Sequence, residues 1–223
     1  MTRLLSHDEA RAFYDRFGAK QDAQAWYEEP ALERLVAHAD FSAAQDVVEI
    51  GCGTGRFAER LLSHHLPPTA RYTGTDLSAT MIDLARQRLR SYEDRVVLHL
   101  ADGRPLLPLP DASVDRVVST YVLDLLDEGE IAAWIAEAHR VLRPNGRLAV
   151  CGLTAGESTL ARWVTSAWRT VHSWRPALVG GCRPLQLRRF FDERLWLPPT
   201  RAVVEPYGLA SEALVVTKRT PEA

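Results

Sequence analysis

The sequence predicts an α/β protein built on a doubly wound sheet of seven strands, mostly parallel, with an antiparallel C-terminal hairpin at one edge. Three observations predict it: short apolar runs, helical segments between them, and a final pair of runs joined by a turn. Five runs are aliphatic or β-branched nearly throughout, as in strands that are buried on both faces: 46–50, 71–75, 96–100, 114–119 and 147–153. Strands that alternate with helices need crossover connections and therefore run parallel.

The helical segments follow from periodicity and end signals. We expect helices over 56–62, 78–91 and 130–142. Ser78 is the N-cap candidate of the second helix, and Pro144-Asn145-Gly146 is a stop and turn signal after the third. Residues 8–39 are expected to be helical with interleaved aromatic residues. Pro30 should open the second of two helices there, because the missing N–H costs little at a helix start.

The C-terminal runs 201–204 and 213–218 complete the sheet. They are separated by about eight residues, including Pro206 and Gly208, which is too short for a helical crossover, so they should pair antiparallel. The chain is therefore expected to be a single domain. Its parts are an N-terminal helical lid (1–45), a ligand-binding core (46–153), a cap insertion (154–195) and the C-terminal strands (196–223).

Composition excludes several classes of protein. The 223 residues include 27 Lys+Arg and 29 Asp+Glu, a formal net charge of −2, which gives no support for binding nucleic acid by bulk electrostatics. Cys52, Cys151 and Cys182 lie far apart and form no CxxC pair, so we expect no disulfide framework, no metal site and a cytoplasmic location. No uncharged apolar run approaches 20 residues, so no membrane span is expected.

Three glycines alternate directly after the first predicted strand, at Gly51, Gly53 and Gly55. They let the backbone approach a ligand closely, and the following helix start favours an electron-rich group. A tight strand-to-helix turn would need one or two glycines, so a ligand loop is favoured. A dinucleotide fingerprint needs its third glycine at position 56, which is Arg56, and a P-loop needs a lysine that is absent here.

Acidic residues end the second and third predicted strands. Asp76 lies about 20 residues past the glycine loop, where a carboxylate can accept hydrogen bonds from both ribose hydroxyls of a nucleoside. Its alternative role is to cap the next helix, which Ser78 could also do. Asp102 ends the third strand before Gly103, and its alternative role is Asp-Gly turn chemistry.

Taken in order, five motifs resemble the class I S-adenosylmethionine-dependent methyltransferases, which have a Rossmann-like fold. The motifs lie at 47–55, 74–81, 101–103, 115–120 and 138–148. The resemblance is greatest to the small-molecule branch that includes the quinone-biosynthesis C-methyltransferases (methyltransferase type 11). It covers roughly residues 46–153, and the flanking segments match in general layout.

The resemblance implies that S-adenosyl-L-methionine is the cofactor and S-adenosyl-L-homocysteine the product. The implied cofactor-binding residues are Tyr14, Glu49, Gly51, Cys52, Gly53, Gly55, Asp76, Leu77, Met81, Asp102, Gly103 and Thr120. Glu49 should anchor the loop or reach the cofactor's amino group, and Asp76 should hold the ribose. Asp102 should accept from the adenine amine, and Tyr14 should close over the cofactor.

The implied reaction is methyl transfer to a small-molecule acceptor. A sulfonium methyl is already activated, so the protein must chiefly position the acceptor, and no catalytic triad is needed. If the acceptor must lose a proton, the candidates for a general base are Tyr121 and Asp124, which follow the fourth strand, and His172 in the cap. The alternative for the first two is a turn at a helix start. Rival functions are an inactive cofactor-binding module with a regulatory or scaffold role and, disfavoured by Arg56, a nicotinamide-dependent oxidoreductase.

The cap insertion interleaves tryptophans with arginines. Trp163, Trp168 and Trp174 lie within twelve positions, beside Arg162, Arg169 and Arg175. One interpretation is a lid whose aromatic residues cover an apolar or lipid-like substrate, with the arginines near an acidic group. The other is an amphipathic helix that packs its tryptophans on the core and leaves its arginines in water.

Overall fold

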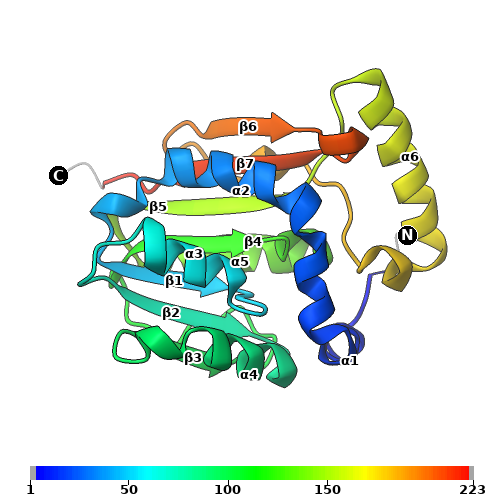
Figure 1. Cartoon of the computed structure of the whole chain (residues 1–223). Helices are drawn as coiled ribbons and strands as arrows, with labels where there is room; N and C mark the ends of the chain where they lie inside the picture. Colours follow the sequence, from blue (N-terminus) through cyan, green and yellow to red (C-terminus); the bar gives the residue numbers. More distant parts are fainter. Residues whose placement is uncertain (1–3, 221–223) are drawn as a thin grey trace.

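The computed structural model describes residues 4–220, apart from the side chains of residues 177 and 178. Within that range seven strands form one sheet in the order β3-β2-β1-β4-β5-β7-β6 (Figure 1). Their bounds are β1 Asp46–Ile50, β2 Arg71–Asp76, β3 Val96–Leu100, β4 Val114–Thr120, β5 Leu142–Leu153, β6 Thr200–Val204 and β7 Ser211–Thr217. The pairs from β3 to β5 are parallel, whereas β7 runs antiparallel to both β5 and β6. The predicted fold class is confirmed.

Helices cover both faces of the sheet. Their bounds are α1 His7–Phe17, α2 Ala25–Ala39, α3 Arg56–His64, α4 Ala79–Arg88, α5 Glu128–Val141 and α6 Thr159–Trp174. Successive strand residues face opposite layers, so Val47 packs with α2 and α3 whereas Val48 packs with α5. The sheet is therefore buried between two apolar layers, and ligand chemistry is left to its edges and ends.

Capping side chains set where the helices begin. Ser78 accepts from the backbone N–H of Met81, as the sequence predicts, although α4 ends at Arg88 rather than at residue 91. A reciprocal capping box between Asp127 and Glu130 starts α5. These local bonds satisfy N–H groups that the helix leaves without a partner.

Two predicted element starts lie five residues too late. Pro30 does not open a helix: α2 begins at Ala25 as a continuation of the 3-10 helix η1 (Gly18–Gln24), so Pro30 lies inside α2 and removes one intrahelical hydrogen bond. The fifth strand was expected from residue 147, yet β5 starts at Leu142, immediately after α5. Its register with β4 shifts between Val114 and Arg116, which lets the Pro-Asn-Gly turn lie within the strand.

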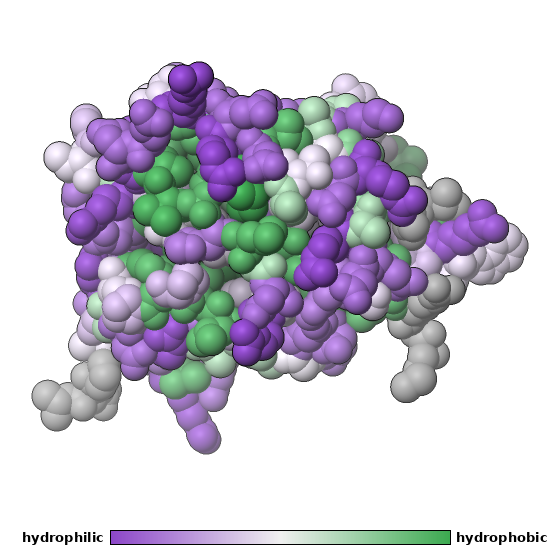
Figure 2. Space-filling view, turned by 90° about the horizontal axis from the view of Figure 1, so that it is seen from below, coloured by the Kyte–Doolittle hydropathy of each residue, from purple (hydrophilic) through white to green (hydrophobic). Residues whose placement is uncertain are grey.

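The carboxyl ends of the strands form the end of the sheet that faces α1. In Figure 1 the arrowheads of β1, β2 and β4 point toward this helix, and α6 stands beside the same end. Seen from below, hydrophobic and charged residues mix on the face that carries the edge strand β3 (Figure 2), where Val97 and Leu100 are exposed. Among residues 4–220 no helix has the length and apolar character needed to cross a bilayer.

Candidate functional site

Two adjoining cavities lie where β1, β2 and β4 end. The first is here called the apolar cavity. It is lined by Gly51 and Asp76, which follow the strands, and by Leu5, His7 and Tyr14 of the N-terminal segment. The second, here called the polar cavity, is lined by Glu28, Glu49 and Arg56 among others. The residues that line both are Gln21, Gly51, Gly53, Thr120 and Tyr121. The two cavities therefore meet at the glycine loop.

The glycine loop uses backbone conformations that its sequence allows. Gly51, Gly53 and Gly55 all have positive φ, at 73°, 51° and 77°. A Cβ on Gly51 would lie 2.2 Å from Val122 Cγ2, so this loop packs directly against the segment after β4. A Cβ on Gly55 would instead press on the Cα of Ala85 at 3.1 Å, so Gly55 serves the packing of α3 on α4 and does not line either cavity.

Asp76 joins the end of β2 to the loop. Its Oδ2 accepts from the N–H of Gly53 and its Oδ1 from the N–H of Ser78, both at 2.9 Å. Burial raises the pKa of this carboxyl, and the two backbone hydrogen bonds act in the opposite direction. Asp76 thus combines the predicted place at the cavity with a local turn role, while Ser78 caps α4.

Glu49 lies beneath the polar cavity and is 1% exposed. Tyr72 donates its hydroxyl to Glu49 Oε2 at 2.6 Å. Burial is the larger effect and raises the pKa of Glu49 to about 7. The side chain of Thr120 is a second hydrogen-bonding partner of this carboxyl, and its two oxygens keep further acceptor capacity.

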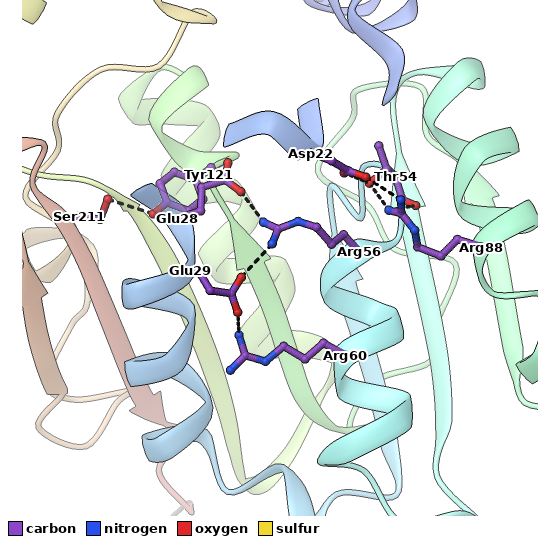
Figure 3. Close-up of polar contacts among 9 residues, drawn as sticks. All are labelled: Asp22, Glu28, Glu29, Thr54, Arg56, Arg60, Arg88, Tyr121 and Ser211. Atoms are coloured by element: carbon purple, nitrogen blue, oxygen red, sulfur yellow. Dashed lines mark hydrogen bonds and ion pairs between the residues drawn. The ribbon is translucent and has the colours of Figure 1, made fainter. Parts of the chain in front are cut away.

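Ion pairs fasten the N-terminal segment (residues 4–45) to the glycine loop and α3 (Figure 3). Arg56 reaches Glu28 at 2.7 Å and Glu29 at 2.8 Å, and Arg60 also pairs with Glu29. Burial raises the pKa of Glu28 to about 7, even though the Arg56 guanidinium opposes the shift. The pairs hold α2 against the start of α3 at the wall of the polar cavity.

A second set of contacts holds η1. Asp22 accepts from the hydroxyl of Thr54 and from the guanidinium of Arg88, each at 2.6 Å (Figure 3). Arg88 also donates to Thr54, both to its hydroxyl at 2.6 Å and to its carbonyl at 3.0 Å. We call Asp22, Thr54 and Arg88 the clamp; it joins η1, the glycine loop and α4.

The structure places most predicted cofactor residues at the cavities. Tyr14, Leu77, Met81, Gly103 and Thr120 line the apolar cavity, and Cys52 lines the polar one. Asp102 does not line either: its carboxylate is more than half exposed and accepts from Arg104 Nε at 2.7 Å. Its contact with adenine stays a prediction.

The three candidates for proton transfer have different surroundings. Tyr121 lines both cavities, has φ of 55°, and donates its hydroxyl to Ser211 Oγ at 2.9 Å. Asp124 is 1% exposed; its Oδ2 accepts from Leu153 N at 3.1 Å, and its Oδ1 has no hydrogen-bond partner among the described residues. Burial raises the pKa of Asp124 to about 7. His172 lines neither cavity.

In the cap, side chains from two helices bind three successive carbonyls. Tyr14 of α1 donates to the carbonyl of Gly180 at 3.3 Å, His172 Nε2 lies 3.0 Å from that of Gly181, and Trp168 Nε1 donates to that of Cys182 at 2.9 Å. Trp163 and Trp174 are 74% and 82% exposed. These two tryptophans neither pack on the core nor line the described cavities, so neither predicted interpretation of the cap describes them.

The residues that sequence reasoning missed belong to the N-terminal segment. Gln21, Asp22 and Glu28 reach the glycine loop from η1 and α2, and no local motif marks them. Their acidic or amide character close to an aromatic-rich helix was the available signal. Among residues 4–220 no group of three or more His, Cys, Asp and Glu side chains could hold a metal ion.

Comparison with known proteins bears on the motif-bearing core. Residues 47–146 match the family profile described as "Methyltransferase domain". The chain is 33% identical over 157 residues to a malonyl-[acyl-carrier protein] O-methyltransferase of Hahella chejuensis, covering 70% of this chain and 53% of that protein. It is 32% identical over 110 residues to a demethylmenaquinone methyltransferase of Tropheryma whipplei, covering 49% and 42%. The chain thus spans about half the length of the curated relatives it matches.

Solved structures share the fold at low identity. The [4+2]-cyclase SpnF superposes with a TM-score of 0.70 at 17% identity, over 97% of this chain and 98% of that one. A geranyl diphosphate C-methyltransferase from Streptomyces coelicolor, solved with S-adenosyl-L-homocysteine, superposes with a TM-score of 0.62 at 17% identity, over 86% and 77%. Residues 47–146 thus match a methyltransferase domain in sequence, and the described fold is shared with these solved structures.

Proposed function

We propose that this chain binds S-adenosyl-L-methionine and transfers its methyl group to a small-molecule acceptor. The observation that carries the proposal is the meeting of an apolar and a polar cavity at the glycine loop. A nucleoside joined through sulfur to an amino acid needs both kinds of surroundings in one continuous site. The family's dependence on this cofactor and the named methyltransferase relatives support it.

The residues present fit such a cofactor. In the apolar cavity, Leu77 and Met81 offer apolar contacts for a purine beside the carboxylate of Asp76 for a ribose. In the polar cavity, the carboxyl of Glu49 and the guanidinium of Arg56 provide both signs of charge. An amino acid carries an ammonium and a carboxylate, so it requires both.

The proposed reaction requires little covalent chemistry from the protein itself. When bound, the cofactor supplies a methyl group on a positively charged sulfur, whose departing thioether is neutral. The chain's task is to hold the acceptor in line with that methyl group, and positioning of this kind can supply several kcal/mol, up to about 10. The walls that would do so include Leu5, Tyr14, Val122 and Leu125.

If the acceptor must lose a proton, Asp124 is the predicted base whose carboxylate keeps an oxygen, Oδ1, without a hydrogen-bond partner among the described residues. Burial raises its pKa to about 7, but the side chain is 1% exposed and lines neither described cavity, so no direct contact with an acceptor supports this role. Tyr121 and Leu125, its neighbours in sequence, line the apolar cavity. The hydroxyl of Tyr121 and the ring of His172 are instead engaged by Ser211 and Gly181.

The acceptor class follows from the walls of the cavity. They are mostly apolar, which suits an apolar acceptor or the apolar part of an acidic one. Relatives named for malonyl groups on acyl-carrier protein and for demethylmenaquinone support acceptors of this kind. A cytoplasmic location is part of the proposal. The fold alone does not establish methyl transfer, because one structure that shares it is titled a cyclase.

Calorimetry with S-adenosyl-L-methionine, S-adenosyl-L-homocysteine and NAD tests the proposal. Both sulfur compounds should bind and NAD should not, and Asp76→Ala should weaken S-adenosyl-L-homocysteine at least about tenfold, since it removes the ribose acceptor. Asp83→Ala is the matched control, because Asp83 is an exposed carboxylate on α4. Binding of NAD without any response to the sulfonium compound would contradict the proposal, and binding without turnover on any acceptor would favour the inactive module.

A further inference from the structure

No local contact explains the position of the Gln21 side chain in the fold. It belongs to η1, yet it lines both cavities at their junction. Its Oε1 is buried and has no hydrogen-bond partner among the described residues. A buried amide oxygen without a donor is unfavourable by about 1 to 3 kcal/mol, so such groups are rare unless a ligand or water completes them.

The amide lies directly over the glycine loop. A Cβ built on Gly53 would stand 2.9 Å from Gln21 Oε1 and 3.4 Å from its Nε2. Gly53 therefore leaves open the space that brings the amide of η1 and the backbone of the loop together. The amide faces the part of the loop that borders the polar cavity, where Glu49 and Arg56 also lie.

The clamp fixes this arrangement from the neighbouring residue. Asp22 follows Gln21 directly, and its carboxylate is bound by Thr54 of the loop and by Arg88 of α4. Ion pairs between charged groups that are both less than one-third exposed restrict η1 far more than a surface pair would. The position of Gln21 is thus fixed before a ligand binds, which lowers the entropy cost of ordering this residue upon binding.

An amide offers one acceptor and two donors at one end of a side chain. The unpartnered oxygen needs a donor, and the amide N–H groups can serve an acceptor at the same place. An α-amino acid presents an ammonium and a carboxylate within a few atoms of each other. We propose, resting on the proposed function, that Gln21 binds the amino-acid end of S-adenosyl-L-methionine, with its Oε1 accepting from the ammonium group.

The alternative contacts for Gln21 fit less well. The ribose acceptor predicted from sequence is Asp76, and the apolar side chains Leu77 and Met81 lie in the apolar cavity without reaching the polar one. Gln21 lines the polar cavity together with Glu49 and Arg56, and it also lines the apolar cavity where the two meet. The purine is assigned to the apolar cavity beside Leu77 and Met81, so the donor proposed for the Gln21 oxygen is the ammonium group in the polar cavity.

Two ligands separate this inference from a structural role. S-adenosyl-L-homocysteine carries the amino-acid end, and 5′-methylthioadenosine keeps the adenosine and the thioether but lacks it. Calorimetry on the full chain should show Gln21→Leu weakening S-adenosyl-L-homocysteine about tenfold, or about 1.4 kcal/mol, while 5′-methylthioadenosine changes less than about twofold. Gln24→Leu, in the same segment and outside both cavities, should change neither.

Each outcome of these measurements either supports or contradicts the inference about Gln21. Selective loss of S-adenosyl-L-homocysteine supports the inference; equal loss of both ligands, or no loss, overturns it. Thermal unfolding of each variant without ligand identifies a folding defect, and Gln21→Asn, which keeps the amide but shortens its reach, then carries the same test. If the unsubstituted chain binds neither ligand, the proposed function itself fails. If it binds both and Gln21→Leu behaves like it, the assignment of Gln21 fails and the proposed function stands.

Discussion

The N-terminal segment (residues 4–45) and the cap (154–195) both flank the carboxyl ends of the strands, and they are attached in different ways. The N-terminal segment is tied to α3 and α4 by ion pairs and to the glycine loop by the hydrogen bond from Thr54 to Asp22, and it lines both cavities. In the cap, Trp168 and His172 of α6 bind carbonyls of the loop that follows, and α6 contributes no side chain to the described cavities. Proximity to the site is shared, but direct contact with it is not.

This difference indicates which of the two regions should respond when the proposed cofactor binds. Charged groups that meet across two elements depend on both being docked, so the N-terminal segment and the loop should be ordered together. The cap reaches the site indirectly, through residues that themselves line the apolar cavity: the Tyr14 hydroxyl donates to the carbonyl of Gly180, and the guanidinium of Arg183 donates to the carbonyl of Leu126. We therefore expect substitutions in the two regions to separate binding from stability.

The largest effect should come from the clamp. Asp22→Ala removes two acceptor contacts at 2.6 Å and leaves Arg88 without its closest carboxylate. We expect a loss of about 3 kcal/mol in unfolding free energy, together with at least about a tenfold loss of affinity for S-adenosyl-L-homocysteine. Denaturant unfolding with and without the ligand measures both. Trp163→Ala, on an exposed side chain of α6, is the control and should stay within about 0.5 kcal/mol.

A smaller effect, limited to stability, is expected in the cap. His172 is 1% exposed and binds the carbonyl of Gly181, so His172→Ala should cost about 2 kcal/mol of unfolding free energy by loss of packing and of that bond. Affinity for S-adenosyl-L-homocysteine should change less than about twofold. A parallel fall in affinity, like that of Asp22→Ala, would break the distinction between the two regions.

The smallest effect should be seen through pH, at the junction of core and cap. Asp124 has a pKa raised by burial to about 7, and its carbonyl accepts from the N–H of Arg183 in the cap. A carboxyl with a raised pKa stabilises the fold below its unfolded value, near 4, and loses that contribution as pH rises through 7.

Asp124→Asn removes this titration and can keep the bond to Leu153. Its melting temperature should therefore fall less than that of the unsubstituted chain between pH 6 and pH 7, by an amount corresponding to about 1 kcal/mol. Glu28 and Glu49 shift in the same direction and are present in both proteins, so the difference isolates Asp124. Parallel curves for the two proteins would show that Asp124 stays ionised in the fold.

Much of the fold could be predicted because its signals are local. The apolar runs at β1 and β3 have the predicted bounds, and the short link before β7 correctly implies an antiparallel pair. Helix starts were less certain where no cap marks them: α2 continues from η1 without a side-chain cap, so Pro30 was placed at a start that lies five residues earlier.

The residues of the candidate site that lie at strand ends could be predicted from the sequence, whereas those of the N-terminal segment could not. Gly51, Gly53 and Asp76 are set by strand ends, which the sequence pattern locates. Gln21 matters because η1 docks on a loop more than 30 residues away, a contact that no spacing rule describes. Asp102 does not line the described cavities, and its carboxylate accepts from Arg104, two residues on. Contacts between segments that are distant in the sequence depend on the tertiary structure, and so does the choice of partner for a side chain such as that of Asp102.

The three cysteines are buried in three different segments of the chain, and burial raises the pKa of each thiol. Cys52 lies in the glycine loop, Cys151 in β5 and Cys182 beside Tyr14 in the cap. Because a thiolate must form and be reached before it reacts, alkylation of each requires a different part of the molecule to open. The chain therefore carries three native reporters, whose labelling rates distinguish movement of the cap, release of the loop and unfolding of the sheet.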